Sequence, residues 1–161
     1  MDLFVVSHKN MVWKIKEFLK NSGYTKYSVI TRYPTEDEKN TSVLPLVACQ
    51  IGGAINYDKE LSTEPGEAVD YIIDIFASTQ SQLDSVVYAI MKNIKRENFL
   101  LFYDMSILEP TIIGDYSGLS SLGLSEVMST SFRKDQIVGY TSDKREIYNA
   151  FIITNLKLPI L

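Results

Sequence analysis

Two carboxylates on one face of an apolar segment are the first candidates for acid–base chemistry. Asp70 and Asp74 lie four positions apart in AVDYIIDIFA, residues 68–77. A strand advances by about 3.4 Å per residue, which would place the two side chains about 14 Å apart. Paired carboxylates of glycosidases stand only about 5 to 9.5 Å apart. We therefore predict surface or turn-facing acids here, not a hydrolytic pair.

A cysteine nucleophile is the second candidate, because the chain has one cysteine, Cys49, and one histidine, His8. A dyad of the two stays open from the sequence. Cys49 lies in the apolar run LVACQI, however, where a small buried thiol is the usual explanation. One thiol provides neither an internal disulfide nor a cluster of metal ligands, and it fits a reducing compartment. We expect no metal site and no enzymatic activity.

A glycine-rich segment follows the spacing of a phosphate-binding P-loop. It runs from Gly118 through Gly123 to Ser125. Leu124 occupies the place of the lysine that must reach the phosphates. This argues against nucleotide binding, and no cofactor is expected.

Composition limits the chain to one core and disfavours a nucleic-acid binder. It has 161 residues, 45% hydrophobic, with a formal charge of −4. Charge is uneven, because the range 36–74 holds nine acidic residues against two lysines, a local −7 that leaves +3 elsewhere. An acidic surface facing a partner and a solvated loop are both open interpretations. The N-terminus lacks the features of a signal peptide, and no segment reaches membrane length, so we expect an unexported chain without membrane contact.

A predicted strand and the helix that follows it hold Asp70 and Asp74 in place. The range 68–77 alternates as a strand, and an amphipathic helix extends to Ile94, with Thr79 and Gln82 as a capping box at its start. A helix over 9–21 has an apolar stripe, with Lys14, Lys16, Glu17 and Lys20 on its polar face. Other predicted strands are 27–33, 43–51, 99–103, 108–113 broken by Pro110, and an internal last strand 146–158. Because Pro45 cannot donate a backbone hydrogen bond, the strand 43–51 either begins at an edge of the sheet or has loop as its first residues. The range 124–132 is predicted to be a strand or a short helix.

These elements predict an α+β fold in a single domain, residues 1–161. A central, mainly antiparallel or mixed sheet would be packed by two main helices. A polar excursion at 52–66 would form an extended β-arm, and residues 105–142 would form an insertion.

The strand–helix unit and the last strand together resemble the tail terminator proteins of long-tailed, siphovirus-type bacteriophages. The resemblance rests on VDYIIDIFASTQSQLDSVVYAIMKNI, residues 69–94, and on IYNAFIITNLKL, residues 147–158. In that family an acid-punctuated apolar strand enters a helix through a glutamine or serine cluster, and a late strand carries a tyrosine followed by alternating apolar residues. Residues 105–142 are not explained by the resemblance.

The resemblance implies a structural virion protein that assembles in the host cytoplasm. It would form a homohexameric ring at the head-proximal end of the tail, on the tail tube protein, stop tube elongation and offer a surface to the head-completion protein. Tyr57, Asp58 and Lys59 are then expected as inter-subunit contacts. Glu36, Asp37 and Glu38 are expected to face the lumen, where a ring of −24, six times −4, would let DNA pass without specific binding.

Two alternatives stay open. The chain could be another head–tail joining or tail-tube protein, which self-limiting assembly would distinguish from a terminator. It could also be a small ligand-binding α+β domain whose tyrosines line a pocket.

Overall fold

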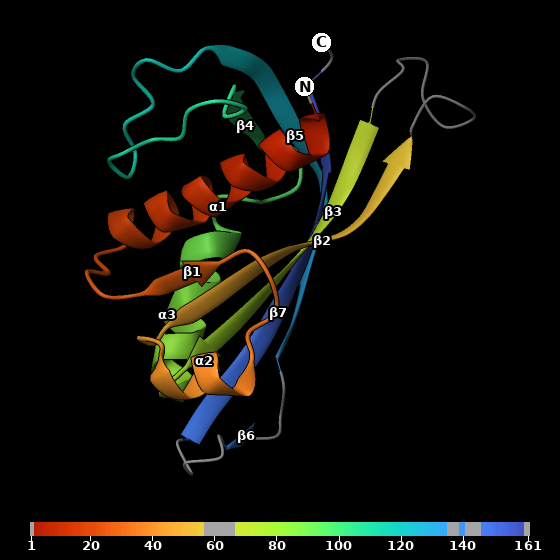
Figure 1. Cartoon of the computed structure of the whole chain (residues 1–161). Helices are drawn as coiled ribbons and strands as arrows, with labels where there is room; N and C mark the ends of the chain where they lie inside the picture. The colour runs from red at the N-terminus through yellow and green to blue at the C-terminus, as the bar shows by residue number, and fades with distance from the viewer. Residues whose placement is uncertain (1, 57–66, 135–138, 141–145, 160–161) are drawn as a thin grey trace.

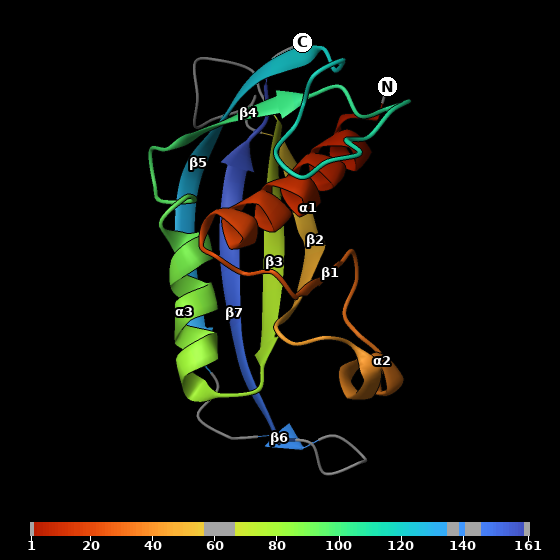
Figure 2. The same ribbon diagram turned by 90° about the vertical axis from the view of Figure 1, so that its left-hand side faces the viewer.

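One twisted sheet forms the centre of the molecule, and α1 and α3 cover one of its faces (Figures 1 and 2). The structure, a computed structural model, describes residues 2–56, 67–134, 139–140 and 146–159. The elements in chain order are α1 (Leu3–Asn21), β1 (Ser28–Ile30), α2 (Glu36–Thr41), β2 (Leu46–Asn56), β3 (Glu67–Ala77), α3 (Gln80–Met91), β4 (Phe99–Tyr103), β5 (Ser121–Lys134), β6 (Gly139–Tyr140) and β7 (Glu146–Lys157). Within these ranges no helix is both long and apolar enough to cross a membrane.

The strand order confirms the predicted fold class. The sheet runs β1-β2-β3-β7-β5-β4, with β6 paired to β7. β1 pairs with β2 in parallel, and the other pairs are antiparallel. The chain is therefore α+β, with a mainly antiparallel central sheet and two main helices. β7 lies between β3 and β5, as the apolar groups on both faces of the last strand predicted.

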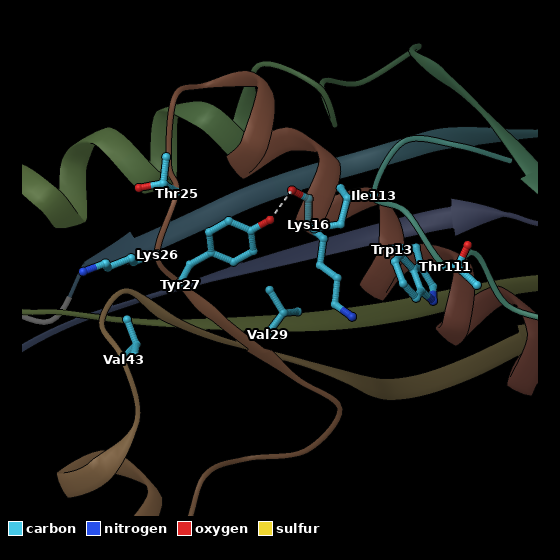
Figure 3. Close-up of a pocket in the computed structure, with 9 residues that line it drawn as sticks. All are labelled: Trp13, Lys16, Thr25, Lys26, Tyr27, Val29, Val43, Thr111 and Ile113. Carbon is cyan, nitrogen blue, oxygen red and sulfur yellow. Dashed lines mark hydrogen bonds between the residues drawn. The ribbon is translucent and has the colours of Figure 1, made fainter.

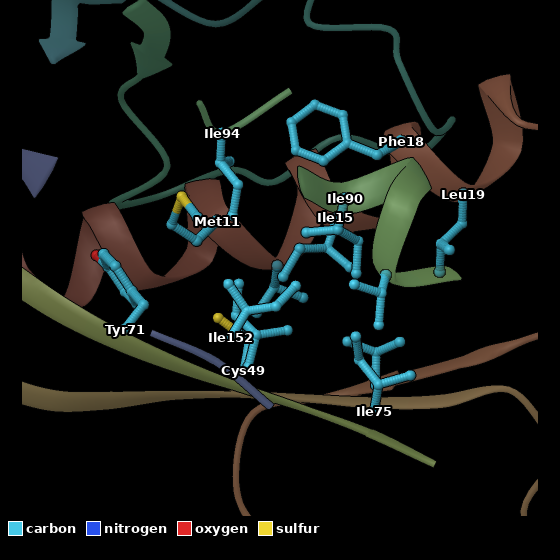
Figure 4. Close-up of a cluster of buried hydrophobic side chains, with 14 of the residues drawn as sticks. Met11, Ile15, Phe18, Leu19, Cys49, Tyr71, Ile75, Ile90, Ile94 and Ile152 are labelled. Atoms are coloured by element: carbon cyan, nitrogen blue, oxygen red, sulfur yellow. The ribbon is translucent and has the colours of Figure 1, made fainter. Parts of the chain in front are cut away.

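The alternation in β3 decides which sheet face the helices cover. Tyr71, Ile73 and Ile75 point toward α1 and α3 and are completely buried. Met11 and Ile15 of α1 meet them from above (Figure 4). Each such side chain stabilises the fold by roughly 1.5–3 kcal/mol relative to exposure, so this face supplies the main core.

The other face of the sheet is covered only near α2. Leu46, Phe76 and Ile147 form a small second cluster there. Farther along the same face Ile153 is 39% exposed. Alternation continues across this face, and α1 and α3 both lie on the opposite side of the sheet (Figure 1).

Several predicted boundaries were wrong, each for a local reason. α1 begins at Leu3 and not at residue 9, because Asp2 Oδ1 accepts hydrogen bonds from the backbone of Phe4 (3.0 Å) and Val5 (3.3 Å). β1 covers only Ser28–Ile30. β2 runs to Asn56 instead of ending at residue 51, and 57–66 lie outside the described residues.

Two polar or broken segments also differ from expectation. The polar stretch after Pro34 contains α2, because Thr35 and Glu38 form a complete capping box. Residues 108–113 are not a strand. The range 124–132, which the sequence left open, lies within β5.

α3 starts where the capping pattern placed it. The Thr79 side chain accepts a hydrogen bond from the backbone of Gln82 at 3.0 Å. The Gln82 side chain reaches back one residue further than a capping box requires and accepts from the Ser78 backbone at 2.9 Å. The helix ends at Met91, before the predicted Ile94.

Candidate functional site

Large apolar side chains are exposed on β4 and the start of β5, on the sheet face away from α1, and on the segment that crosses α1 between these strands. We call these residues the apolar end. They are six of the fourteen large apolar side chains that the described ranges leave exposed, namely Phe99 (56%), Leu101 (36%), Ile107 (92%), Leu108 (63%), Ile112 (58%) and Leu124 (57%). Contiguous exposed apolar surface marks interaction sites more often than single scattered side chains do.

The sheet part of the apolar end follows from alternation in β4. Leu100 and Phe102 point into the core, so Phe99 and Leu101 must point outward. Leu124 of β5 lies directly opposite Leu101. β4 is also the last strand in the sheet order, with no strand on its outer side in the described part of the chain. An apolar edge strand in this position invites pairing with another chain.

The remaining three side chains project from residues 104–120, which we call the strap. The strap crosses from β4 to β5 over α1 (Figure 2). Side chains of α1 hold it along its length, through Lys9 Nζ to Met105 O (3.2 Å), Trp13 Nε1 to Glu109 Oε1 (3.1 Å), Tyr116 OH to Glu17 Oε2 (2.7 Å) and Lys20 Nζ to Ile113 O (3.2 Å). The strap is therefore a fixed platform for its exposed apolar groups.

Asn10 anchors the start of the strap. Its side-chain amide is fully buried, accepts from the Tyr103 backbone N–H (2.8 Å) and donates to the Tyr103 carbonyl (2.8 Å). The amide thus bonds the end of β4 as a neighbouring strand would. This pairing satisfies two backbone groups that lie at the edge of the sheet.

Lys14 lies under the strap, beside two stacked tyrosine rings. Tyr103 and Tyr116 stack with centroids 4.4 Å apart, and Lys14 Nζ is 4.5 Å from the Tyr116 ring centroid. Burial lowers the pKa of Lys14, while the nearby Glu17 raises it. Burial, together with the hydrogen bond to Glu17, raises the pKa of Tyr116. The prediction of a solvent-facing Lys14 was wrong, since it is only 9% exposed.

The carboxylates of the central strand are structural. The prediction of surface acids was wrong for Asp74, which is 8% exposed and accepts from Gln50 Nε2 at 3.0 Å. Asp70 is half-buried and accepts from Asn155 Nδ2 at 2.7 Å. Each acid thus has its own amide partner on a different neighbouring strand.

His8 contacts the backbone carbonyl of Cys49 and not its thiol. His8 Nε2 lies 2.6 Å from the Cys49 carbonyl oxygen. A carbonyl only accepts, so this nitrogen carries the hydrogen. The thiol itself is fully buried, and burial raises its pKa to about 12. The arrangement does not generate a thiolate nucleophile.

The three acids predicted to line a lumen form the first turn of α2. Glu38 pairs with Arg32, and this contact lowers the pKa of Glu38 to about 2. Glu36 lies 3.9 Å from Lys39 Nζ. Asp37 is exposed and makes no ion pair in the described ranges. The predicted contact residues Tyr57, Asp58 and Lys59 lie outside the described residues.

A groove lies between α1, β1, Val43 and the part of the strap that contains Thr111 and Ile113 (Figure 3). Its volume is about 490 Å³. Its lining residues are Trp13, Lys16, Thr25, Lys26, Tyr27, Val29, Val43, Thr111 and Ile113. Lys16 Nζ lies 4.0 Å from the Trp13 ring centroid, and Tyr27 OH donates to the Lys16 carbonyl at 3.3 Å.

Sequence reasoning missed the strap and its anchors. Trp13 and Asn10 on the polar side of α1 were the available signal, because a large ring and a short amide there indicate a covered face. Nothing in the sequence pairs them with residues about ninety positions later.

Comparisons with known proteins add little to this geometry. No protein-family model matches the chain, and no curated protein sequence matches it. Among solved structures, a chain of a particle described as "Virion of native gene transfer agent (GTA) particle" aligns with a TM-score of 0.39 and 9% identity, over 89% of this chain and 90% of that chain. A likeness this weak carries no conclusion about function.

Proposed function

We propose that the chain is a structural virion protein, and more specifically a tail terminator. It would form a homohexameric ring on the end of the phage tail tube, stop tube elongation and provide the tail-side surface for head joining. The resemblance of residues 69–94 and 147–158 to that family motivates the proposal. The apolar end is the observation that carries it, because assembly proteins need an exposed surface that a partner covers. The proposal gives the chain no catalytic role and no cofactor.

The energetics of the apolar end favour association. Ile107 is 92% and Leu108 63% exposed, and full burial of such side chains is worth roughly 1.5–3 kcal/mol each. The strap beneath them is already fixed to α1, so little ordering cost offsets this gain. A partner that covers the strap and the outer edge of β4 would gain apolar contact and backbone hydrogen bonds together.

In the proposed ring, different regions have different partners. The apolar end binds the tail tube protein, and the opposite side of the ring meets the head-completion protein. Tyr57, Asp58 and Lys59 contact the neighbouring subunit, and Glu36, Asp37 and Glu38 face the DNA that passes through. The protein assembles in the host cytoplasm and resides at the head-proximal end of the tail.

Imaging with tail tubes tests the proposal. Purified protein is mixed with tubes and examined by negative-stain electron microscopy. Discs seated at one tube end, together with a halt in tube growth, are expected. Open-ended polymers of the protein itself would point to a tail-tube protein instead.

A small ligand-binding domain is the second candidate, because the groove beside Lys16 has a volume of about 490 Å³, which is within the range of ligand pockets. A protein that stays monomeric at all concentrations and does not bind tail tubes would support this alternative.

A further inference from the structure

The groove between α1, β1 and the strap has the chemistry of a binding site for acidic segments. We propose that it binds a short peptide segment of a partner protein that carries a carboxylate next to an apolar side chain. The carboxylate would meet Lys16 beside Trp13, and the apolar group would lie on Val29 and Val43. This inference goes beyond the proposed virion role and does not depend on it.

Lys16 differs from every other lysine of α1. Lys9 and Lys20 donate to strap carbonyls, and Lys14 lies under the strap beside tyrosine rings. Lys16 turns the other way, and its ammonium lies between Trp13 and Val29 (Figure 3). It has no carboxylate within 4.0 Å in the described ranges. A cation on an aromatic face, without its own anion, favours an incoming carboxylate.

The shape of the groove favours a segment of a larger partner over a free small molecule. Thr25, Lys26, Val43 and Thr111 are exposed on its walls, so it lies open along one side. Small-molecule sites bury most of the ligand surface. An open apolar trough instead accommodates one or two side chains of a chain lying across it.

Charge selects a peptide over nucleic acid. Two lysines line the groove, Lys16 near Trp13 and Lys26 beyond Tyr27 at the other end (Figure 3). The whole chain carries −4. Nucleic-acid binding draws on many phosphate contacts in a basic background, whereas one or two carboxylates match two cations.

Trp13 is the only tryptophan of the chain, so its fluorescence reports on the groove directly. The probe is an acetylated, amidated peptide of alternating glutamate and leucine, and its counterpart has glutamine in place of glutamate. We expect a saturable change of emission with the first peptide and at least tenfold weaker binding of the second. Lys16→Gln should weaken binding roughly two- to fivefold, as for one exposed ion pair, and Lys16→Arg should restore it.

Matched variants keep the test decisive. Arg133→Gln removes one exposed charge on β5 and should leave binding unchanged, because β5 lies three strands away from β2 and the groove lies beside β1, on the far side of β2. Val43→Ser changes a half-exposed wall residue without risk to the core and should weaken binding. The proposal is overturned if both peptides bind alike, if Lys16→Gln folds normally and binds as tightly as Lys16→Arg, or if inorganic phosphate or a single-stranded oligonucleotide binds more tightly than the glutamate peptide.

Discussion

The two ends of the molecule expose different kinds of side chain, since the α2 end exposes charged groups and the apolar end exposes apolar ones. At the α2 end, two of the three acids have a cation partner within the chain, because Glu38 pairs with Arg32 and Glu36 lies near Lys39, and Thr35 caps the helix. At the apolar end the backbone is firmly bonded, but Ile107 and its neighbours project into water. The difference shows that rigidity and solubility are separate properties of a surface. The α2 end is complete by itself, whereas the apolar end gains stability only when something covers it.

The strap explains how the apolar end stays ordered without a core of its own. Hydrogen bonds from α1 side chains run along the helix from Lys9 to Lys20, and Met105 of the strap is fully buried. These anchors fix the backbone and leave Ile107, Leu108 and Ile112 exposed. Loss of an anchor at the apolar end should therefore lower stability more than loss of an ion pair at the α2 end.

Loss of the Asn10 anchor should have the largest effect. Asn10→Ala leaves the N–H and carbonyl of Tyr103 without their partner, and each buried unpaired group costs about 1–3 kcal/mol. We expect the free energy of unfolding to fall by roughly 2–4 kcal/mol, and amide hydrogens of residues 104–120 to exchange faster. Asn21→Ala, at the exposed end of the same helix, is the control. Equal losses in the two variants would show that Asn10 does not hold the strap.

Lys14 should make stability depend on alkaline pH. Burial lowers the pKa of Lys14 in the folded protein below the usual 10.5. Between the folded pKa and 10.5 the unfolded chain therefore binds more protons than the folded protein, and stability rises with pH toward 10.5. Lys14→Met should flatten this rise and raise the melting temperature at pH 7 slightly. Thermal melts of both proteins between pH 7 and pH 10 measure the slope, below the range where tyrosine ionisation dominates. An unchanged slope in Lys14→Met would refute the assignment.

The α2 end should respond least, because its ion pair is in solvent. The contact with Arg32 lowers the pKa of Glu38 from 4.5 to about 2. Its contribution to stability is therefore present above pH 4.5 and is lost as pH falls through about 2. Arg32→Gln should shift this loss to higher pH, with little change at pH 7. NMR titration of the carboxyl groups measures the shift, and a Glu38 pKa that stays near 2 would contradict it.

The contrast between the two ends also explains what the sequence could predict. Strands β3, β4 and β7 were predicted because period-two alternation reflects burial by a nearby layer, as in Ile73 and Leu100. α2 has no apolar stripe, so periodicity missed it, although the Thr35 and Glu38 capping box was readable. The strap depends on bonds between residues about ninety positions apart, such as Asn10 with Tyr103. No local pattern encodes such pairs, so residues 108–113 resembled a strand.

Binding to tail tubes tests most directly whether the apolar end is an assembly surface. Light scattering with tail tubes, across a concentration series, would compare the native chain with Ile107→Asp/Leu108→Asp, and with Glu36→Gln/Asp37→Asn at the α2 end as the matched control. We predict that the native chain and the α2 control bind the tubes. The apolar-end variant should not bind them and should keep an unchanged melting temperature. Equal binding of all three proteins would contradict the account.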